Sequence, residues 1–201
     1  DPGSHSTIFT YRGGGDWRGI ENLEAYVEFY FQNGRNNGTG PGTIDVGAYA
    51  FQVGGEYTFT GSLKPWVGIN FTTFSGDRHA VPNGKASMFN SYSGLHDLLI
   101  LEDMYYGFDW DTNYRALKVS GGISLTAARE NDLRLSLIVG LTRSAEPVRF
   151  AFETTRKLGN EIDLKADWEM TKQFVLRLGV GYLFGSEILE DSMGGPGAPD
   201  P

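Results

Sequence analysis

The sequence predicts an all-β chain folded as antiparallel strands, and three observations lead to this prediction. Apolar and polar side chains alternate with a period of two in seven segments, which is the spacing of a strand that is dry on one face and wet on the other. The connections between these segments alternate between short and long. No segment has a helical period, and no apolar run approaches the roughly 18 residues that a membrane helix needs.

The N-terminal half is expected to begin with a weak strand near residues 5–12, which three stronger strands follow. Residues 22–32, NLEAYVEFYFQ, alternate throughout. Residues 44–59 place their later aromatic side chains on one parity, and residues 65–74 alternate more loosely. Because aromatic and β-branched side chains at this period favour strands, we expect a strand in each of these segments.

The C-terminal half is expected to contribute four strands. Residues 115–125 and 132–142 each place aliphatic side chains on one parity. Residues 161–170, EIDLKADWEM, alternate almost one for one between apolar and charged side chains. Residues 174–184, FVLRLGVGYLF, set large apolar side chains against a parity that includes arginine and glycine. The whole chain is therefore expected to contain seven or eight strands.

The connections predict which kind of sheet these strands build. Three are short and three are long: 60–64, 128–131 and 171–173, against 33–42, 75–112 and 143–160. Barrels of bacterial outer membranes have this asymmetry, with short periplasmic turns and longer external loops. We therefore expect 75–112 to be a long external loop, and we interpret 187–201 as a loop or disordered tail.

The composition excludes several other classes of protein. The 201 residues include no cysteine, so a disulfide framework and a thiolate metal site are both excluded. The net charge of −8 and a pI near 4.9 disfavour nucleic-acid binding, which usually requires a basic stripe. A mean hydropathy of −0.30 is compatible with a membrane barrel, because alternating strands average to a polar value.

The dry face of the strands is expected to point outward, toward lipid. A soluble barrel would have to bury the charged side chains that share one parity of the strands, which is costly unless every charge is paired. Aromatic residues also occur near the strand ends on the dry parity, as in the interfacial girdles of membrane barrels, at Tyr57, Phe59, Trp168, Phe174, Tyr182 and Phe184. The fold predicted for residues 1–201 is thus a single antiparallel transmembrane β-barrel domain, or a fragment of one.

In that barrel the charged parity would line the lumen. The residues expected there are Glu24, Glu28, Glu56, Lys118, Arg134, Asp163, Lys165, Asp167, Glu169 and Arg177. Two other folds remain open. One is a soluble extracellular β-sandwich that binds carbohydrate, in which Leu133 to Leu141 would form a core against a second sheet. The other is a small structural barrel without a pore.

Several segments, taken in order, resemble the alginate export family of bacterial outer-membrane proteins. They are NLEAYVEFYFQNG, IDVGAYAFQVGGEYTF, KPWVGINFTTFSGD, FNSYSGLHD and NEIDLKADWEMTKQFVLRLGVGYLFGSEILEDS, which cover most of residues 20–192. The resemblance implies one large barrel, on the order of 16–18 strands, of which this chain would be the C-terminal half. It also implies a closing strand after Asp191, so we expect a fragment of the larger barrel, with closure of seven or eight strands as the alternative.

The resemblance further implies passive secretion of a polyanionic polysaccharide through a pore rich in arginine. The charged parity of the strands carries seven acids, the six named above and Glu161, against four bases. That balance does not favour a polyanion as cargo. The expected function is therefore a porin-like channel of the bacterial outer membrane, not an enzyme. Its partners would be the bilayer and small solutes or polysaccharide, with no nucleic acid and no cofactor.

The long loop 75–112 carries the one cluster of residues that could bind a metal ion. Its acidic and imidazole side chains are Asp77, His79, His96, Asp97, Glu102, Asp103, Asp109 and Asp111. Oxygen-rich clusters can bind Ca²⁺, but no EF-hand spacing occurs, and we expect a solvated acidic loop without a metal. The remaining histidine, His5, lies outside the seven main segments, so no Ser–His pair is expected in their strands. We expect Gly179 and Gly181 to relieve crowding or to permit the strand to bend.

Overall fold

The computed structural model describes residues 6–37, 43–77, 85–89, 97–103, 112–127, 131–150 and 153–185. Within these residues it contains strands and no helix, which confirms the all-β prediction. No helix long and apolar enough to cross a membrane occurs in these ranges. The strands are β1 (Ser6–Ile20), β2 (Leu23–Asn37), β3 (Thr43–Thr58), β4 (Trp66–Phe74), β5 (Lys85–Ala86), β6 (Tyr114–Ala127), β7 (Asn131–Phe150), β8 (Glu153–Thr171) and β9 (Phe174–Phe184).

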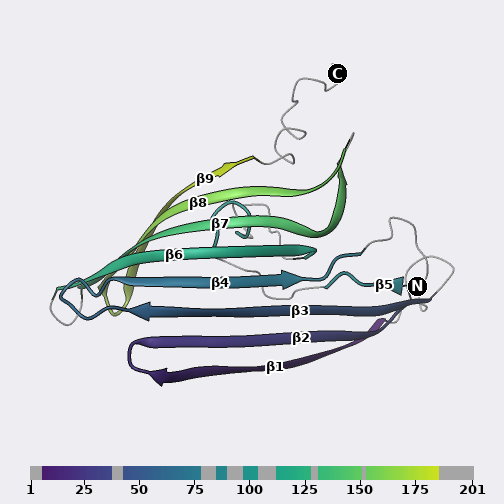
Figure 1. Cartoon of the computed structure of the whole chain (residues 1–201), viewed down its shortest axis with the longest axis horizontal. Coiled ribbons are helices and arrows are strands. Elements are labelled where there is room, and N and C mark those ends of the chain that lie inside the picture. The colour runs from purple at the N-terminus through teal and green to yellow at the C-terminus, as the bar shows by residue number, and fades with distance from the viewer. Residues whose placement is uncertain are drawn as a thin grey trace, which may run out of the picture.

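All strands belong to one sheet with the order β1-β2-β3-β4-β6-β7-β8-β9 (Figure 1). Each of these strands runs antiparallel to its neighbours, whereas the two-residue β5 pairs in parallel with β3. Apart from β5, strands that follow one another in the chain therefore lie side by side in the sheet. The sheet is open in this structure, with β1 and β9 at its two edges.

Strand lengths depart from the sequence prediction at three places. β2 continues to Asn37, five residues into the long connection expected at 33–42. β1 extends from Ser6 to Ile20 and is much longer than the weak strand expected near 5–12. The prediction of a long loop at 143–160 is wrong, because β7 continues to Phe150 and β8 begins at Glu153. The register shifts on both sides of Arg143. Such irregularities break the two-residue alternation, so the strand continues where the sequence pattern stops.

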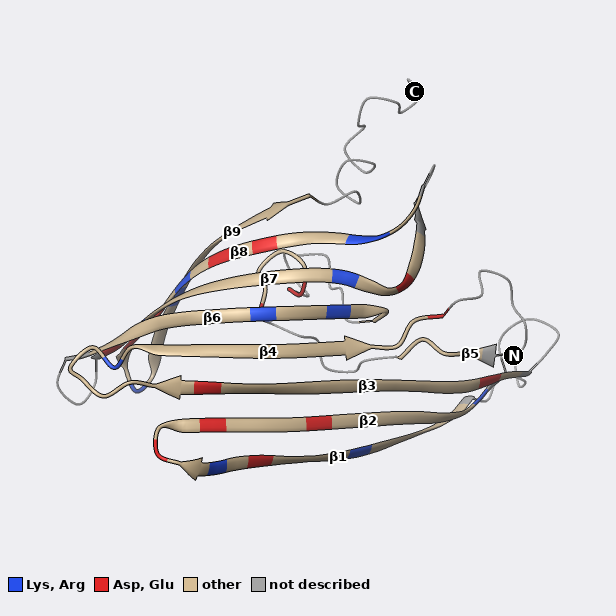
Figure 2. Ribbon diagram, viewed as in Figure 1, with Lys and Arg blue, Asp and Glu red and all other residues tan. Residues whose placement is uncertain are grey.

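The register divides the side chains between two faces. Residues directly opposite each other share a face, and one such row runs Glu24, Glu56, Gly68, Ser120, Ile138 and Asp163. We call the face that carries this row, and the residues that alternate in phase with it, the polar face. The opposite side, which carries Val27, Val53, Ile69, Val119 and Leu137, is the apolar face. Figure 2 marks the charged residues along the strands.

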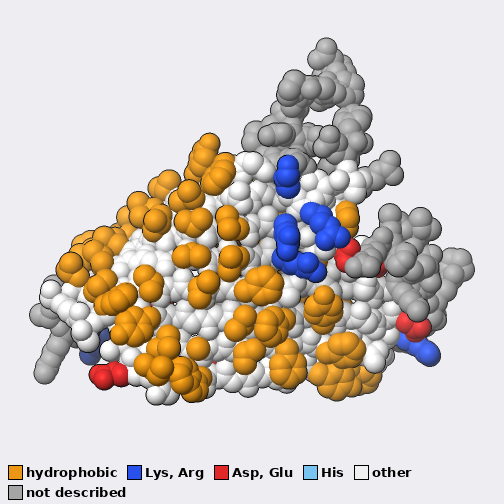
Figure 3. All heavy atoms as spheres, in the orientation of Figure 1, with side chains coloured by type: hydrophobic (Ala, Val, Ile, Leu, Met, Phe, Trp, Pro, Cys, Tyr) orange, Lys and Arg blue, Asp and Glu red, His pale blue; other side chains and the backbone are white. Residues whose placement is uncertain are grey.

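Exposure on the two faces is the reverse of the usual pattern for a soluble protein. Large side chains of the apolar face are open over the whole sheet, with exposed fractions up to 72% at Val180 (Figure 3). On the polar face, Lys118, Glu161 and Asp163 are almost completely buried. A small hydrophobic cluster also lies on the polar face, toward the end where β6 begins. It consists of Ala48, Ala50, Phe74, Phe89, Leu98, Leu101, Tyr114, Ala116 and Leu158.

Candidate functional site

Residues 97–103, here called the inner turn, lie against the polar face of β6 to β9. Leu98 and Leu101 are buried there. A Cβ atom on Gly140 would lie 2.7 Å from Cδ1 of Leu98, and one on Gly179 would lie 2.7 Å from Cδ1 of Leu99. Glycine at these positions therefore allows the inner turn to approach the strands closely. The crowding that the sequence suggested comes from this turn at Gly179. At Gly181 it comes first from Asp163 of β8, whose Oδ1 would lie 2.6 Å from a Cβ atom, and then from Ile100 of the turn at 3.2 Å.

Carboxylates on β8 hold the inner turn by its backbone. Glu161 accepts hydrogen bonds from the N–H groups of Ile100 at 2.6 Å and Leu101 at 2.9 Å. Asp163 accepts one from the N–H of Leu99 at 2.9 Å. Hydrogen bonds to ionised carboxylates are stronger than neutral ones, and they offset part of the cost of burying these two acids. The sheet therefore presents acceptors that match the exposed donors of the turn.

Lys118 ties the turn to β6. Its Nζ donates to Oδ2 of Asp97 at 2.5 Å and to Oε1 of Glu102 at 3.1 Å. Glu102 also accepts from the hydroxyl of Tyr114 at 2.9 Å and from the N–H of Leu98 at 3.1 Å. The buried cation thus meets two acids, and Glu102 has partners on both of its oxygens. This network satisfies the buried charges on both the turn and the strand.

These contacts correct the expectation of a solvated acidic loop. Glu102 is 1% exposed and part of the network, whereas the side chain of Asp97 is 55% exposed, as expected for a solvated residue. Of the other residues considered for Ca²⁺, His79, His96, Asp109 and Asp111 lie outside the described residues, as does His5. No group of three or more acidic or imidazole side chains placed to hold a metal ion occurs among the residues that the structure describes.

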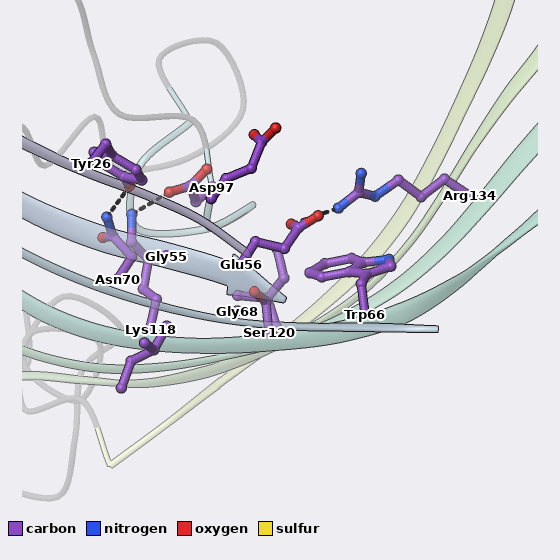
Figure 4. Close-up of a pocket in the computed structure, with 13 residues that line it drawn as sticks. Tyr26, Gly55, Glu56, Trp66, Gly68, Asn70, Asp97, Lys118, Ser120 and Arg134 are labelled. Carbon is purple, nitrogen blue, oxygen red and sulfur yellow. Dashed lines mark hydrogen bonds and ion pairs between the residues drawn. The ribbon is translucent and has the colours of Figure 1, made fainter. Parts of the chain in front are cut away.

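A cavity of about 380 Å³ lies on the polar face beside the inner turn (Figure 4). Arg134 reaches across it from β7, and its Nη2 donates to Oε2 of Glu56 on β3 at 2.9 Å. The guanidinium lies over the ring of Trp66, 4.0 Å from the ring centre. A stacked, ion-paired arginine of this kind has a restricted orientation, so the cavity has a fixed positive group beside a fixed negative one.

The other wall of the cavity carries neutral polar groups. The hydroxyl of Tyr26 accepts hydrogen bonds from the side-chain amides of Asn70 and of Gln52, the latter at 3.3 Å. Asn70 accepts in turn from the hydroxyl of Thr72 at 2.9 Å. Asp97 and Lys118 line the same cavity. The arrangement suits water and polar solutes, because it offers donors, acceptors and paired charges around an open space.

The ten residues predicted to line a lumen all lie on the polar face by register. Four of them, Glu24, Glu56, Lys118 and Arg134, line the cavity. Asp163 and Lys165 instead contact the inner turn, where Lys165 donates to the carbonyl of Asp97. The remaining four, Glu28, Asp167, Glu169 and Arg177, lie elsewhere on the face, with Asp167 and Arg177 paired at 3.5 Å.

Sequence reasoning missed three further contributors to this face. Arg12 and Arg18 on β1 pair with Glu28 and Glu24. They were missed because the alternation of β1 is weak, with three consecutive glycines in its middle. Trp66 was missed because residues 65–74 alternate only loosely, although it shares the parity of Gly68 and Asn70 on the polar face. These arginines reduce the acidic surplus that the sequence suggested.

Comparison of the chain with protein-family models, with curated proteins and with solved structures found no match. The function therefore has to follow from the polar face, the inner turn, the cavity and the exposed apolar face.

Proposed function

We propose that this chain forms the wall of a channel-forming β-barrel in a bacterial outer membrane. The observation that supports this most is the inverted distribution of side chains, with an apolar face exposed over the sheet and charges gathered on the other face. A soluble monomer rarely exposes a continuous apolar patch larger than a few hundred Å². In a barrel the same surface contacts lipid, and the polar face lines a water-filled passage.

The length of the apolar face fits a bilayer. On β7 the outward side chains are aliphatic from Leu133 to Leu141, and the next outward residue is Arg143. A run of this length rises about 28 Å along the strand. At a barrel tilt of about 40° it would cover about 21 Å of depth, close to the apolar band of roughly 25 Å on known barrels.

The contents of the polar face favour a barrel larger than eight strands. An eight-stranded barrel has an interior just wide enough for its own side chains. Here the polar face also carries the inner turn, the ring of Phe89 and a cavity of about 380 Å³. A larger barrel, with further strands between β1 and β9, would hold these features, in agreement with the resemblance to the alginate export family.

The cargo that fits this wall is a small polar solute. Opposite charges alternate across the face, as in the pairs Glu56–Arg134 and Asp167–Arg177, and the inner turn narrows the space beside them. A polyanionic polysaccharide would meet carboxylates without the continuous line of arginines that would favour it. A soluble carbohydrate-binding sandwich is less well supported, because no second sheet covers the apolar face in the part of the chain described.

The proposal is tested with two neighbouring residues of β6 whose side chains point to opposite faces of the sheet. Val119 lies on the apolar face, and Ser120, the next residue, lines the cavity on the polar face. Val119→Arg should lower the free energy of unfolding in lipid vesicles by about 2–4 kcal/mol, because it places a cation near the bilayer midplane. Ser120→Arg should change it by less than about 1 kcal/mol, since its side chain enters an open polar space.

The measurement is a urea titration of the full chain and both variants after refolding into vesicles. Equal losses in the two variants would contradict the facing, and a chain that is monomeric and folded without detergent would contradict the membrane barrel. Passage is then tested by the swelling of vesicles in isotonic arabinose. Folded protein that leaves the vesicles impermeable to such a sugar would contradict the channel.

A further inference from the structure

Three basic residues form one row on the apolar face. Arg115 on β6 lies directly opposite Arg143 on β7, and Arg143 lies directly opposite Lys157 on β8. Figure 3 shows basic side chains gathered beside the apolar surface of the sheet. Like charges placed directly opposite each other on one face destabilise a sheet. The two facing guanidinium groups of Arg115 and Arg143, which both line one hollow, therefore suggest a binding partner that carries negative charge.

The other described charged residues on the apolar face of β2 to β9 lie at the same end of the sheet as this row. On β2 and β3, at the same end of the sheet, Arg35 lies directly opposite Asp45 and pairs with it at 3.1 Å. Between this level and the opposite end, the described outward positions of β2 to β9 carry no charged residue. The cations thus lie in one band, at one border of the apolar surface.

The row borders a hollow with both apolar and basic walls. The hollow measures about 350 Å³. Two adjoining rows of the sheet line it: Phe71, Leu117, Leu141 and Asn160 form one row, and Arg115 and Arg143 lie opposite each other in the other. Glu146 lies with Arg115 in a neighbouring hollow and pairs with Arg156 at 3.3 Å. The hollow therefore offers a positive rim and an apolar floor, which suits a molecule with an anionic head and a hydrocarbon tail.

We propose that this hollow binds the phosphate group of an anionic lipid, with the lipid chains lying on Phe71, Leu117 and Leu141. The inference rests on the proposed membrane barrel. Arg143 directly follows the last outward aliphatic residue of β7, so the row lies at the depth of lipid headgroups. Guanidinium groups bind phosphate in a bidentate manner, and two neighbouring ones present several donors to a single phosphate. A lipid explains why the cations adjoin the apolar face.

The test measures lipid binding by native mass spectrometry of the full chain in neutral detergent. The probe is dioctanoyl phosphatidic acid, with dioctanoyl phosphatidylcholine and inorganic phosphate as comparisons. Phosphatidic acid should bind more tightly than either. The combined variant Arg115→Gln, Arg143→Gln and Lys157→Gln should bind it on the order of a hundredfold more weakly. Arg35→Gln, which removes a paired cation of the same face, should leave the affinity unchanged.

Each alternative outcome is informative. Equal affinity of the triple variant and the unchanged chain would overturn the site, and equal binding of inorganic phosphate would mean a free-anion site that does not involve lipid. Folding in detergent is followed separately by circular dichroism. A chain that folds in detergent but shows no preference for phosphatidic acid contradicts this inference alone, whereas a chain that is folded and monomeric without detergent contradicts the membrane barrel and the inference with it.

Discussion

Lys118 is a buried cation on a face that otherwise carries a cavity and water-accessible ion pairs. It contacts Asp97 and Glu102 of the inner turn, and Glu102 is itself buried. Lys118→Met would keep much of the side-chain volume and remove the charge, which leaves Glu102 buried without its cation. We expect the free energy of unfolding to fall by about 3–5 kcal/mol, measured by urea titration in lipid vesicles.

Two further variants separate the charge from the packing. Adding Glu102→Gln to Lys118→Met removes both charges, and the double variant should recover part of the loss, which a double-mutant cycle measures. Arg177→Met breaks an ion pair on the same face whose arginine is largely exposed, and should cost less than about 1 kcal/mol. Additive losses in the Lys118–Glu102 cycle would contradict a direct interaction between the two charges.

Single residues also mark the limit of what the sequence could predict. The two-residue period was sufficient to place Glu56, Lys118 and Arg134 on one face, because facing in a strand depends only on parity. It could not predict that Glu161 accepts from the N–H of Ile100, 61 residues away. Such a contact leaves no local pattern in the sequence. The sequence around an acidic loop residue also does not show whether that residue is buried with a partner or exposed to solvent.

Among the structural elements, the inner turn is the one whose displacement should change the width of the proposed passage most directly. It lies on the polar face, beside the cavity, and its approach to β7 depends on Gly140. Gly140→Val would place its Cβ 2.7 Å from Cδ1 of Leu98, so the side chain of Leu98 has to shift. Because Leu98 is completely buried, we expect the turn to move with it. We expect the passage to widen and the single-channel conductance in a planar bilayer to increase by tens of per cent or more.

The matched control is Gly47→Val, a glycine of β3 with no heavy atom within 4 Å of the position that its Cβ would occupy. This variant should leave the conductance unchanged, since β-branched residues are well tolerated in open strand positions. If Gly140→Val also leaves the conductance unchanged while the protein folds, the inner turn lies away from the path of the ions, and the constriction has to be sought elsewhere.

The strands themselves were predicted where their alternation is regular. Segments 22–32, 65–74 and 174–184 match β2, β4 and β9 at their cores. The alternation failed on either side of Arg143, where the register shifts, and over the glycines of β1. Both failures have one cause: an irregular or side-chain-free stretch can continue a strand by backbone pairing alone, while it gives no periodic signal in the sequence.

For the whole molecule, the proposed barrel accounts for both faces of the sheet at once. The apolar face needs lipid or another apolar surface, and the polar face needs water or polar partners. The open edges of β1 and β9 need pairing partners in a membrane, because an unpaired strand edge cannot exist in contact with lipid. Closure through further strands would satisfy this requirement and enlarge the lumen around the inner turn.

Ion selectivity is the property of the whole wall that best separates the channel from a polyanion exporter. Glu28, Glu56 and Asp167 each pair with an arginine, and Glu161 and Asp163 bind backbone N–H groups of the inner turn. The acidic surplus facing water is therefore small, and screening acts over roughly 8–10 Å near physiological salt. We expect a weak preference for cations that fades as the salt concentration rises, measured as a reversal potential across a planar bilayer under a salt gradient. Arg134→Gln should strengthen the preference by leaving Glu56 unpaired, and Arg35→Gln on the apolar face should not change it. A strong preference for anions that persists at high salt would instead favour the secretion of a polyanion.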